Sequence, residues 1–309
     1  MTSIRTGIAW LCISSALVAL SACSQTSGAD SPASSETAPV RAAVTPAPAT
    51  TEAGTTEAPT TVPATEAPTT EAPTTTEAPT TTAAPTTTLP SNVVVVGPAV
   101  VPIVAVGKNN GADTFALQGR LNTLGFWAGL PDGQYGFATL QAVMAFQKYI
   151  GLPATGKVDS ATAEYLTAYG DKAHGMADSG TLVEVDKARQ LLFIVVDGQT
   201  LFAFNTSTGS GIPYEAANKN DPTKIEKGDA VTPAGLYKVT RERPEGWWEG
   251  DLGKIYRPKY FVGGIAIHGM TSVPNYPASH GCVRLSTQAM DFVWDSGLVP
   301  VGTPVWVHE

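Results

Sequence analysis

Apolar and polar residues alternate with a period of two in the C-terminal part of the chain. Val183 and Val185 fall on one face, and Glu184 and Asp186 fall on the other, which is typical of a half-buried strand. The apolar run at 191–196 ends in an Asp-Gly turn signal, after which the chain is expected to pair back. Strands are therefore predicted at 182–186, 191–196, 200–204, 236–239, 261–267 and 305–307.

The same region contains one short helix and two long polar stretches. Ser286 is suited to cap a helix over 287–294, so the region is predicted to be mainly β with a minor helix. The polar stretches cover 205–229 and 241–259. Long loops on a β scaffold often form binding sites and lids. We interpret the second stretch, which holds two adjacent tryptophans, as a lid; core packing of one tryptophan is the other interpretation.

The period changes to that of a helix between residues 108 and 172. Leu117, Leu121 and Leu124 fall on one face at i, i+4 and i+7. Asp159 is placed to begin a third, shorter helix that runs through residue 166. The second helix presents Val143, Phe146 and Ile150 on one face. A small three-helix domain is therefore expected here.

Residues 24–107 consist mainly of Thr, Ala, Pro, Glu and Ser, and Glu-Ala-Pro-Thr recurs within them. Proline removes backbone donors and the stretch has little apolar surface to bury, so a disordered linker with polyproline character is predicted. The valine-rich end at 92–106 is β-prone but interrupted by proline. It is either an edge strand packed on the next domain or an apolar end of the linker.

Residues 1–23 have the pattern of a signal peptide, with Arg5 before an apolar run and small residues before Cys23. The run is shorter than the ~20 residues that a membrane-spanning helix needs. Leu20-Ser21-Ala22-Cys23 resembles a bacterial lipobox. This resemblance implies a lipid on Cys23 and an extracytoplasmic, membrane-anchored protein. The alternative is an ordinary signal peptide that is cut elsewhere.

The net charge of −8 is concentrated in the predicted linker, whose acidic residues outnumber its single arginine. A nucleic-acid-binding domain needs clustered lysine and arginine, and no such cluster is present in the sequence. Nucleic acid is therefore not expected as a partner.

Cys282 is the residue that points most directly to chemistry. With Cys12 in the signal segment and Cys23 lipidated, it is the one cysteine that would keep a free thiol. A thiolate is a strong nucleophile, and nearby imidazolium lowers the thiol pKa. His280 is two residues away, and His268 lies fourteen residues upstream. His174 and His308 are interpreted as surface residues.

Two other interpretations of these residues are available. Cys282 could be a buried structural cysteine, with both histidines incidental. The three residues could instead be zinc ligands with water as the fourth. No other cysteine and no adjacent glutamate supports a zinc site, so neither a metal nor a cofactor is predicted.

The pattern His-Gly at 268–269 followed by Ser-His-Gly-Cys-Val-Arg-Leu at 279–285 resembles the active-site signature of the L,D-transpeptidases, which have a YkuD-type catalytic domain. Ser-Thr-Gly at 207–209 and Thr-Pro-Ala-Gly-Leu-Tyr at 232–237 are similar to upstream motifs of that family, in the same order. The resemblance covers 180–309 and implies a β-sandwich.

The resemblance also implies the roles of individual residues. Cys282 would be the nucleophile and His268 the proton shuttle, oriented by a carbonyl at or near Gly269. The backbone N–H groups around His280, Gly281 and Cys282 would hold the oxyanion, with His280 itself ordering the loop. Ser279 is expected to support the site. Weaker substrate contacts are expected from Arg284, Tyr256 and Tyr260. Many relatives have Asn where this chain has Arg284.

The helical segment resembles a three-helix peptidoglycan-binding module. Its matching residues include Leu117-Gln118, Leu124-Gly125-Phe126, Asp132-Gly133 and Phe146-Gln147. This resemblance implies affinity for the cell wall. A spacer bundle that has lost binding is the alternative.

Together the two resemblances imply an enzyme that acts on peptidoglycan stem peptides. The thiol would attack a stem tetrapeptide, release D-alanine, and pass the acyl group to an amine so that a cross-link forms. Hydrolysis, exchange and attachment of a protein would use the same acyl-enzyme. A non-catalytic wall anchor is the alternative of a different class.

Overall fold

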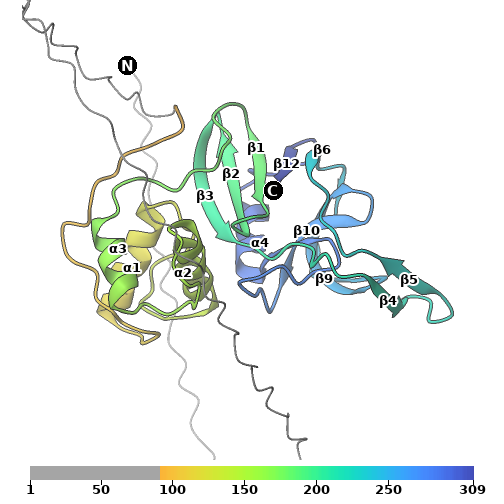
Figure 1. Ribbon diagram of the computed structural model, residues 1–309, viewed down its shortest axis with the longest axis horizontal. Coiled ribbons are helices and arrows are strands. Elements are labelled where there is room, and N and C mark those ends of the chain that lie inside the picture. The colour runs from red at the N-terminus through yellow and green to blue at the C-terminus, as the bar shows by residue number, and fades with distance from the viewer. Residues whose placement is uncertain (1–90) are drawn as a thin grey trace, which may run out of the picture. The chain divides into compact units, whose positions relative to one another are not determined.

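The computed structural model describes residues 91–309, which form three helices followed by a mainly-β region with one further helix (Figure 1). The predicted signal peptide, Cys23 and the predicted linker up to residue 90 lie outside the described residues. No helix in the described part of the chain is long and apolar enough to cross a membrane. The predicted fold class, a helical segment before a mainly-β domain, is confirmed.

The three predicted helices are present, and their apolar faces form one core. Leu117, Leu121 and Leu124 are fully buried, as their spacing predicts. Asp159 caps the third helix, because its side chain accepts a hydrogen bond from the backbone N–H of Thr162. The helices are α1 (Ala112–Thr123), α2 (Phe137–Tyr149) and α3 (Ser160–Ala168).

Residues 91–107 lie against this helical module, so the prediction of disorder is wrong for this end of the linker. The Asn92 side chain is buried and donates two hydrogen bonds to backbone carbonyls of the connector after α3. The backbone N–H of Val96 donates to the carbonyl of Gly170. Val106 joins the apolar core, whereas most of the other valines stay exposed. The segment is held mainly by hydrogen bonds of its backbone and of the Asn92 amide. Such bonds need no regular spacing of apolar residues, so the sequence pattern did not predict them.

The first of two five-stranded sheets has the strand order β3-β2-β1-β12-β6. The predicted hairpin between β2 and β3 is confirmed, with Asp197 and Gly198 both at positive φ in its turn. Its strands are β1 (Leu182–Asp186), β2 (Leu191–Val196), β3 (Gln199–Asn205), β6 (Gly235–Lys238) and β12 (Pro304–His308).

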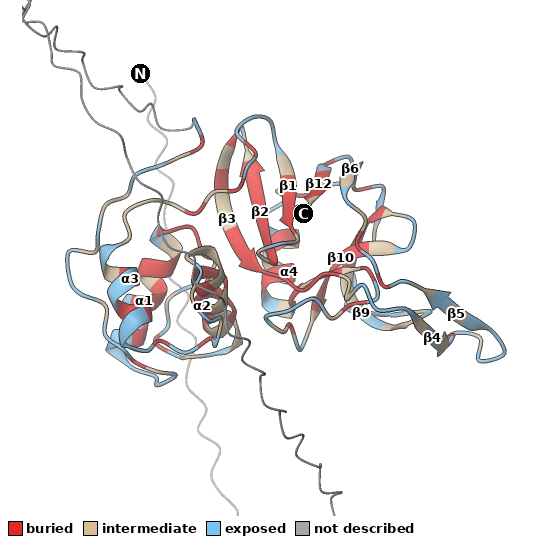
Figure 2. Cartoon of the chain, in the orientation of Figure 1, coloured by how far each residue is buried: buried red, intermediate tan, exposed pale blue. Residues whose placement is uncertain are grey.

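The continuous apolar run of β2 has a simple structural cause, because this strand is buried on both faces (Figure 2). Leu191 and Phe193 pack with the helical module. Leu192 and Ile194 point the other way, into the core of the β region. The helical module and the β region therefore share strand β2, which contributes side chains to the cores of both.

The second sheet has the order β11-β10-β9-β7, with β8 paired to β9. The single strand predicted at 261–267 is wrong, since the chain reverses at Gly263, which has positive φ. The polar stretch 241–259 is largely strand, and a strand directly after Cys282 was not predicted. The strands are β7 (Arg241–Glu242), β8 (Trp247–Gly250), β9 (Gly253–Val262), β10 (Ile265–Met270) and β11 (Val283–Ser286).

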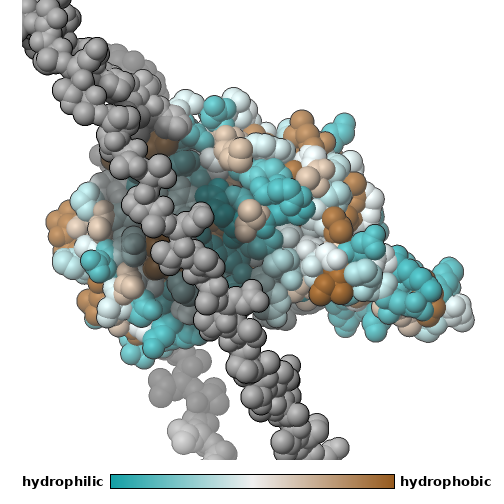
Figure 3. Space-filling model, in the orientation of Figure 1, coloured by the Kyte–Doolittle hydropathy of each residue, from teal (hydrophilic) through white to brown (hydrophobic). Residues whose placement is uncertain are grey.

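The polar stretch 205–229 contains a hairpin of β4 (Tyr214–Ala217) and β5 (Ile225–Gly228). Figure 3 shows hydrophilic residues gathered over this projecting hairpin. Because neither face of it is deeply buried, it has no apolar alternation from which a strand could be predicted.

The two sheets enclose a second core together with α4 (Thr287–Asp295). Val183 and Val305 reach this core from the first sheet, and Ile267 and Val283 reach it from the second. The predicted helix cap is confirmed, since the Ser286 side chain accepts a hydrogen bond from the N–H of Ala289.

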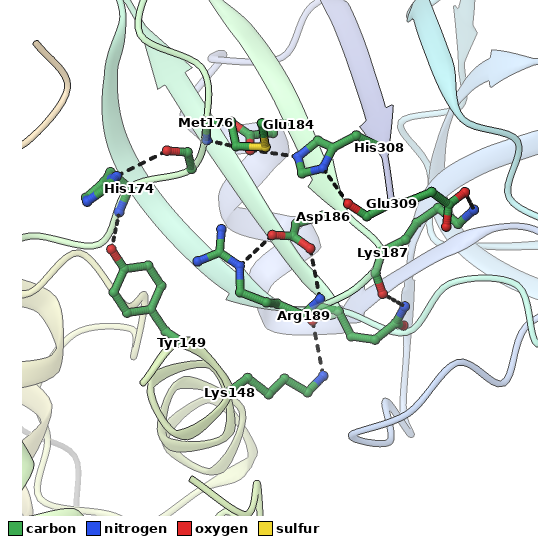
Figure 4. A network of polar contacts seen from close by, with 12 residues as sticks. Lys148, Tyr149, His174, Met176, Glu184, Asp186, Lys187, Arg189, His308 and Glu309 are labelled. Carbon is green, nitrogen blue, oxygen red and sulfur yellow. Dashed lines mark hydrogen bonds and ion pairs between the residues drawn. The ribbon is translucent and has the colours of Figure 1, made fainter. Parts of the chain in front are cut away.

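His308 is not the surface residue that the sequence suggested. Its Nε2 lies 2.9 Å from Oε1 of Glu184, a carboxylate that is fully buried (Figure 4). Glu184 also accepts hydrogen bonds from the backbone N–H groups of Met176 and Ala177. These contacts tie the C-terminal strand to the connector between the helical module and β1.

Candidate active site

Strands β10 and β11 bring the predicted catalytic residues to one side of the second sheet. The strands are parallel, with Ile267 opposite Val283 and His268 opposite Arg284. Ile267 and Val283 point into the core. Because side chains alternate along a strand, His268, Arg284 and Cys282 face the other way. There they line a cleft of about 1160 Å³.

His268 is held as a neutral imidazole. The residue is 2% exposed, and Nδ1 lies 3.0 Å from the carbonyl oxygen of Gly269. A carbonyl can only accept, so Nδ1 carries the proton and Nε2 keeps its lone pair. Burial lowers the pKa of His268 to about 4, Arg284 adds to this lowering, and the Gly269 carbonyl opposes it. The expected contact between His268 and the backbone at Gly269 is present.

Gly269 has a second, steric role. A Cβ at this position would lie 2.9 Å from the Tyr256 ring and 3.1 Å from Cβ of Met290. Glycine therefore lets β10 approach α4 closely.

Cys282 is a partly exposed free cysteine that borders the cleft. Burial of the sulfur raises the pKa of the Cys282 thiol, while the backbone N–H of Ala266 and the charge of Arg284 act to lower it. The net direction is upward, so the resting residue is a thiol at neutral pH. A thiol in this state needs a base to remove its proton before it can act as a nucleophile.

The turn before Cys282 is fixed by two hydroxyl groups. Ser279 Oγ donates to the carbonyl of Cys282 (2.5 Å) and accepts from the N–H of Gly281 (3.0 Å). Thr232 Oγ1 donates to the carbonyl of Gly281 at 2.6 Å. Gly281 has φ of 132°, and a Cβ there would lie 3.0 Å from the carbonyl oxygen of Val231. Only glycine fits this turn.

These contacts correct one expectation. The N–H of Gly281 was expected to help hold an oxyanion, but it donates to Ser279. Thr232, which sequence reasoning placed only in an upstream motif, directly supports the turn before Cys282. Thr232 is fully buried, but it meets the turn from 49 residues away, so no local sequence signal marks this role.

His280 is exposed at the edge of the cleft, where its ring centroid lies 4.6 Å from that of Tyr214. Burial lowers its pKa, and Arg284 lowers it further. The expected role of His280 in ordering the loop stays a prediction. Tyr214 was not predicted as a site residue, since it lies in a polar stretch that looked like a loop.

Arg284 lines the cleft, and its Nε is a buried donor with no partner among residues 91–309. Tyr260 also lines the cleft, with the guanidinium of Arg241 3.7 Å above its ring. Tyr256 does not line the cleft, so its expected substrate contact is not supported. Its hydroxyl donates to Asp291 on α4 at 2.9 Å, which is a structural contact.

The stretch predicted as a lid forms one wall of the cleft. Trp248 and the turn after it line the cleft, with Arg243 stacked 3.6 Å above the Trp248 ring. Both tryptophans of the pair remain about 40–45% exposed. The β4–β5 hairpin supplies further lining residues, Tyr214, Glu226 and Gly228.

The zinc interpretation has no geometric support in the described part of the chain. No three His, Cys, Asp or Glu side chains between residues 91 and 309 come together as metal ligands would, and this includes His268, His280 and Cys282.

Comparison with known proteins matches both regions of the chain to protein families. The model of the YkuD L,D-transpeptidase catalytic domain matches residues 180–307, and that of a peptidoglycan binding domain matches residues 110–166. N-acetylmuramoyl-L-alanine amidase CwlM of Mycobacterium tuberculosis is 48% identical over 46 residues, 15% of this chain and 11% of that protein. The spore cortex-lytic enzyme of Bacillus cereus is 35% identical over 72 residues, 23% of this chain and 28% of that protein. The chain thus spans less than a third of either relative.

A solved structure gives broader coverage. The L,D-transpeptidase (residues 123–326) from Xylanimonas cellulosilytica DSM 15894 is 41% identical, with a TM-score of 0.59. The match covers 68% of this chain and 100% of that one. With the catalytic-domain match over the region that holds Cys282 and His268, this likeness shows that the chain belongs to the L,D-transpeptidase family.

Proposed function

We propose that this chain is a cell-wall L,D-transpeptidase that works through a Cys282 thioester. The observation that carries the proposal is the placement of the free thiol and a neutral, backbone-oriented imidazole on one side of the second sheet, facing one cleft. A nucleophile and a base in one cavity are the minimum for acyl transfer.

In the acylation step, Cys282 attacks the carbonyl of diaminopimelate at the third position of a stem tetrapeptide. Nε2 of His268 takes the thiol proton and passes it to the leaving amine, so D-alanine departs and a thioester remains. In the second step the side-chain amine of a neighbouring stem attacks the thioester. That amine gives a proton to His268, the cross-link forms, and the thiol is restored.

Arg284 supports recognition of an anionic substrate. A buried guanidinium N–H without a protein partner costs free energy unless a ligand satisfies it. Stem peptides carry carboxylates, and guanidinium binds carboxylates strongly. Tyr260, which lines the same cleft, is proposed as a further contact.

The helical module is proposed to bind the wall, in line with its family match. Residues 1–23 are proposed as a lipoprotein signal, with Cys23 as the anchor and residues 24–90 as the tether. Such an arrangement holds an enzyme at a membrane while its catalytic region reaches the wall, because a proline-rich chain is extended.

The experiment is to incubate the protein with a soluble stem tetrapeptide, with and without a second stem as amine acceptor, and to analyse the products. A transpeptidase releases D-alanine and forms a cross-linked dimer. Release of D-alanine without a dimer would indicate a carboxypeptidase instead. No release with an intact thiol would leave the non-catalytic anchor as the function.

A further inference from the structure

One face of helix α2 carries a polar stripe where an apolar one would be expected. Gln141, Ala145 and Lys148 stand at i, i+4 and i+7 and therefore share a face. Gln141 and Ala145 are buried, and Lys148 is half-buried. Burying a glutamine or a lysine on a packed helix face costs free energy of folding unless the side chain is hydrogen-bonded. The hydrogen-bond partners of Gln141 and Lys148 therefore indicate the role of these residues.

Gln141 joins the module to two segments of the catalytic region. Its Nε2 donates to the carbonyl of Val273 at 3.1 Å, and its Oε1 accepts from Nδ2 of Asn205 at 2.6 Å. Val273 lies in the stretch that runs from β10 to Cys282, and Asn205 ends β3. The same side chain thus holds both segments.

Lys148 lies two turns further along α2 and makes the second attachment. Its Nζ donates to the carbonyls of Gln190 and Thr206, at 3.1 and 3.2 Å. Figure 4 shows it pointing from α2 towards the turn that carries Arg189. Burial lowers the pKa of Lys148 to about 7.

The segment 205–209, called here the bridge segment, continues from these contacts to the nucleophile. Thr206 Oγ1 donates to the carbonyl of Arg284 at 2.8 Å, and the N–H of Arg284 donates to the carbonyl of Ser207. The N–H of Ser279 donates to the carbonyl of Thr208 at 2.9 Å. Hydrogen bonds therefore run without a break from α2 to both sides of the Cys282 turn.

We propose that Gln141 and Lys148 are positioning residues for catalysis, which fix the bridge segment and the stretch 271–281 and so place the Cys282 thiol. This inference rests on the proposed acyl transfer and goes beyond it, because it gives the helical module a part in the chemistry that is independent of wall binding. Small displacements of a reacting group cost large factors in rate, on the order of 10²-fold per 1 Å.

The test uses the whole protein and two small soluble substrates, a carbapenem and a stem tetrapeptide, so that wall binding plays no part. Lys148→Met and Gln141→Leu should each lower the limiting rate of acylation at least about tenfold, with a smaller change in KM. Lys148→Arg keeps the charge and the donors and should recover most of the rate. Lys157→Met, which removes an exposed lysine of the same module, should acylate at the parental rate.

A control must separate the effect of lower protein stability on the acylation rate from the effect of a displaced Cys282 thiol. Leu166→Ala opens the module core without touching the polar stripe, so it should lower the unfolding temperature yet leave acylation by the folded protein at the parental rate. If Gln141→Leu does not fold, Gln141→Glu serves in its place, because it keeps the acceptor for Asn205 and loses the donor to Val273.

The proposal is overturned if folded Lys148→Met and Gln141→Leu acylate at the parental rate, or if Leu166→Ala slows acylation as much as they do. If the parent itself forms no acyl-enzyme, the proposed function fails.

Discussion

His268 and Arg284 lie directly opposite each other on the parallel strands β10 and β11. Burial is the main cause of the low pKa of His268, and the guanidinium lowers it further. The same positive charge works against the burial that raises the pKa of Cys282. One side chain therefore favours both the neutral form of the His268 imidazole and ionisation of the Cys282 thiol.

The first prediction concerns the pH dependence of acylation. With the pKa of His268 at about 4, the imidazole is neutral and able to accept a proton from mildly acidic pH upwards. The rate of carbapenem acylation should therefore change less than about threefold between pH 6 and pH 8. Stopped-flow measurement across this range checks it. A parental rate that rises tenfold per pH unit would show that free thiolate reacts without the base.

The matching variant is His268→Ala. Without a base, only the thiolate fraction of Cys282 reacts, and that fraction grows about tenfold per pH unit below its pKa. We expect acylation near neutral pH to fall by roughly two orders of magnitude and to acquire this slope. His280→Ala is the control, and it should lose less and keep the flat profile.

The second prediction concerns Gly281, the glycine before Cys282. Gly281→Ala combines an unfavourable φ of 132° with a Cβ 3.0 Å from a backbone oxygen, so the turn must shift. Acylation should fall on the order of 100-fold, because the thiol moves with the turn. Gly302→Ala has a positive φ of 97° but nothing near its Cβ, so it controls for backbone strain. Equal rates in the two variants would refute a steric role for Gly281.

The third prediction concerns Arg284. Arg284→Gln should raise the KM for a stem tetrapeptide about tenfold or more, because a charged hydrogen bond to a carboxylate is lost. Amidation of the terminal carboxylate should weaken binding to the parent and have little further effect on the variant. Steady-state kinetics of both peptides with both proteins measure this. Equal losses from amidation in parent and variant would show that Arg284 does not contact that carboxylate.

The fourth prediction concerns the segment before α1. A chain that begins at Ser91 should be as stable as the parent, whereas one that begins at Asn109 loses buried Val106 and the hydrogen bonds of 91–107. The loss should be on the order of 3 kcal/mol in the free energy of unfolding, measured by urea denaturation. Asn92→Ala should reproduce part of it, while exposed Val100→Ser should not. Equal stability of both truncated chains would contradict this packing.

The elements that could be predicted from sequence are those with a clear local cause. The α1 leucines, the β2–β3 hairpin and the caps at Asp159 and Ser286 each satisfy a spacing or turn rule within a few residues. The signature around Cys282 identified the family because its motifs were found together, in order.

The missed features depend on contacts between distant segments. The order at 91–107 comes from hydrogen bonds to residues near 170, and strand β11 forms only because β10 lies beside it. Thr232 and Gln141 donate hydrogen bonds to Gly281 and Val273, which lie far from them in the sequence. Contacts between distant segments produce no periodic pattern in the local sequence. The wall of the cleft and the sharing of strand β2 between the two cores could therefore be identified only from the structure.

The central claim is that Cys282 forms a covalent acyl-enzyme, and intact mass spectrometry after incubation with a stem tetrapeptide tests it most directly. We predict that the parent gains the mass of the tripeptide acyl group, with loss of D-alanine, and that peptide mapping places it on Cys282. Cys282→Ala should gain nothing. A folded Cys282→Ala variant that still carries the adduct, or still cross-links stems, would contradict the account.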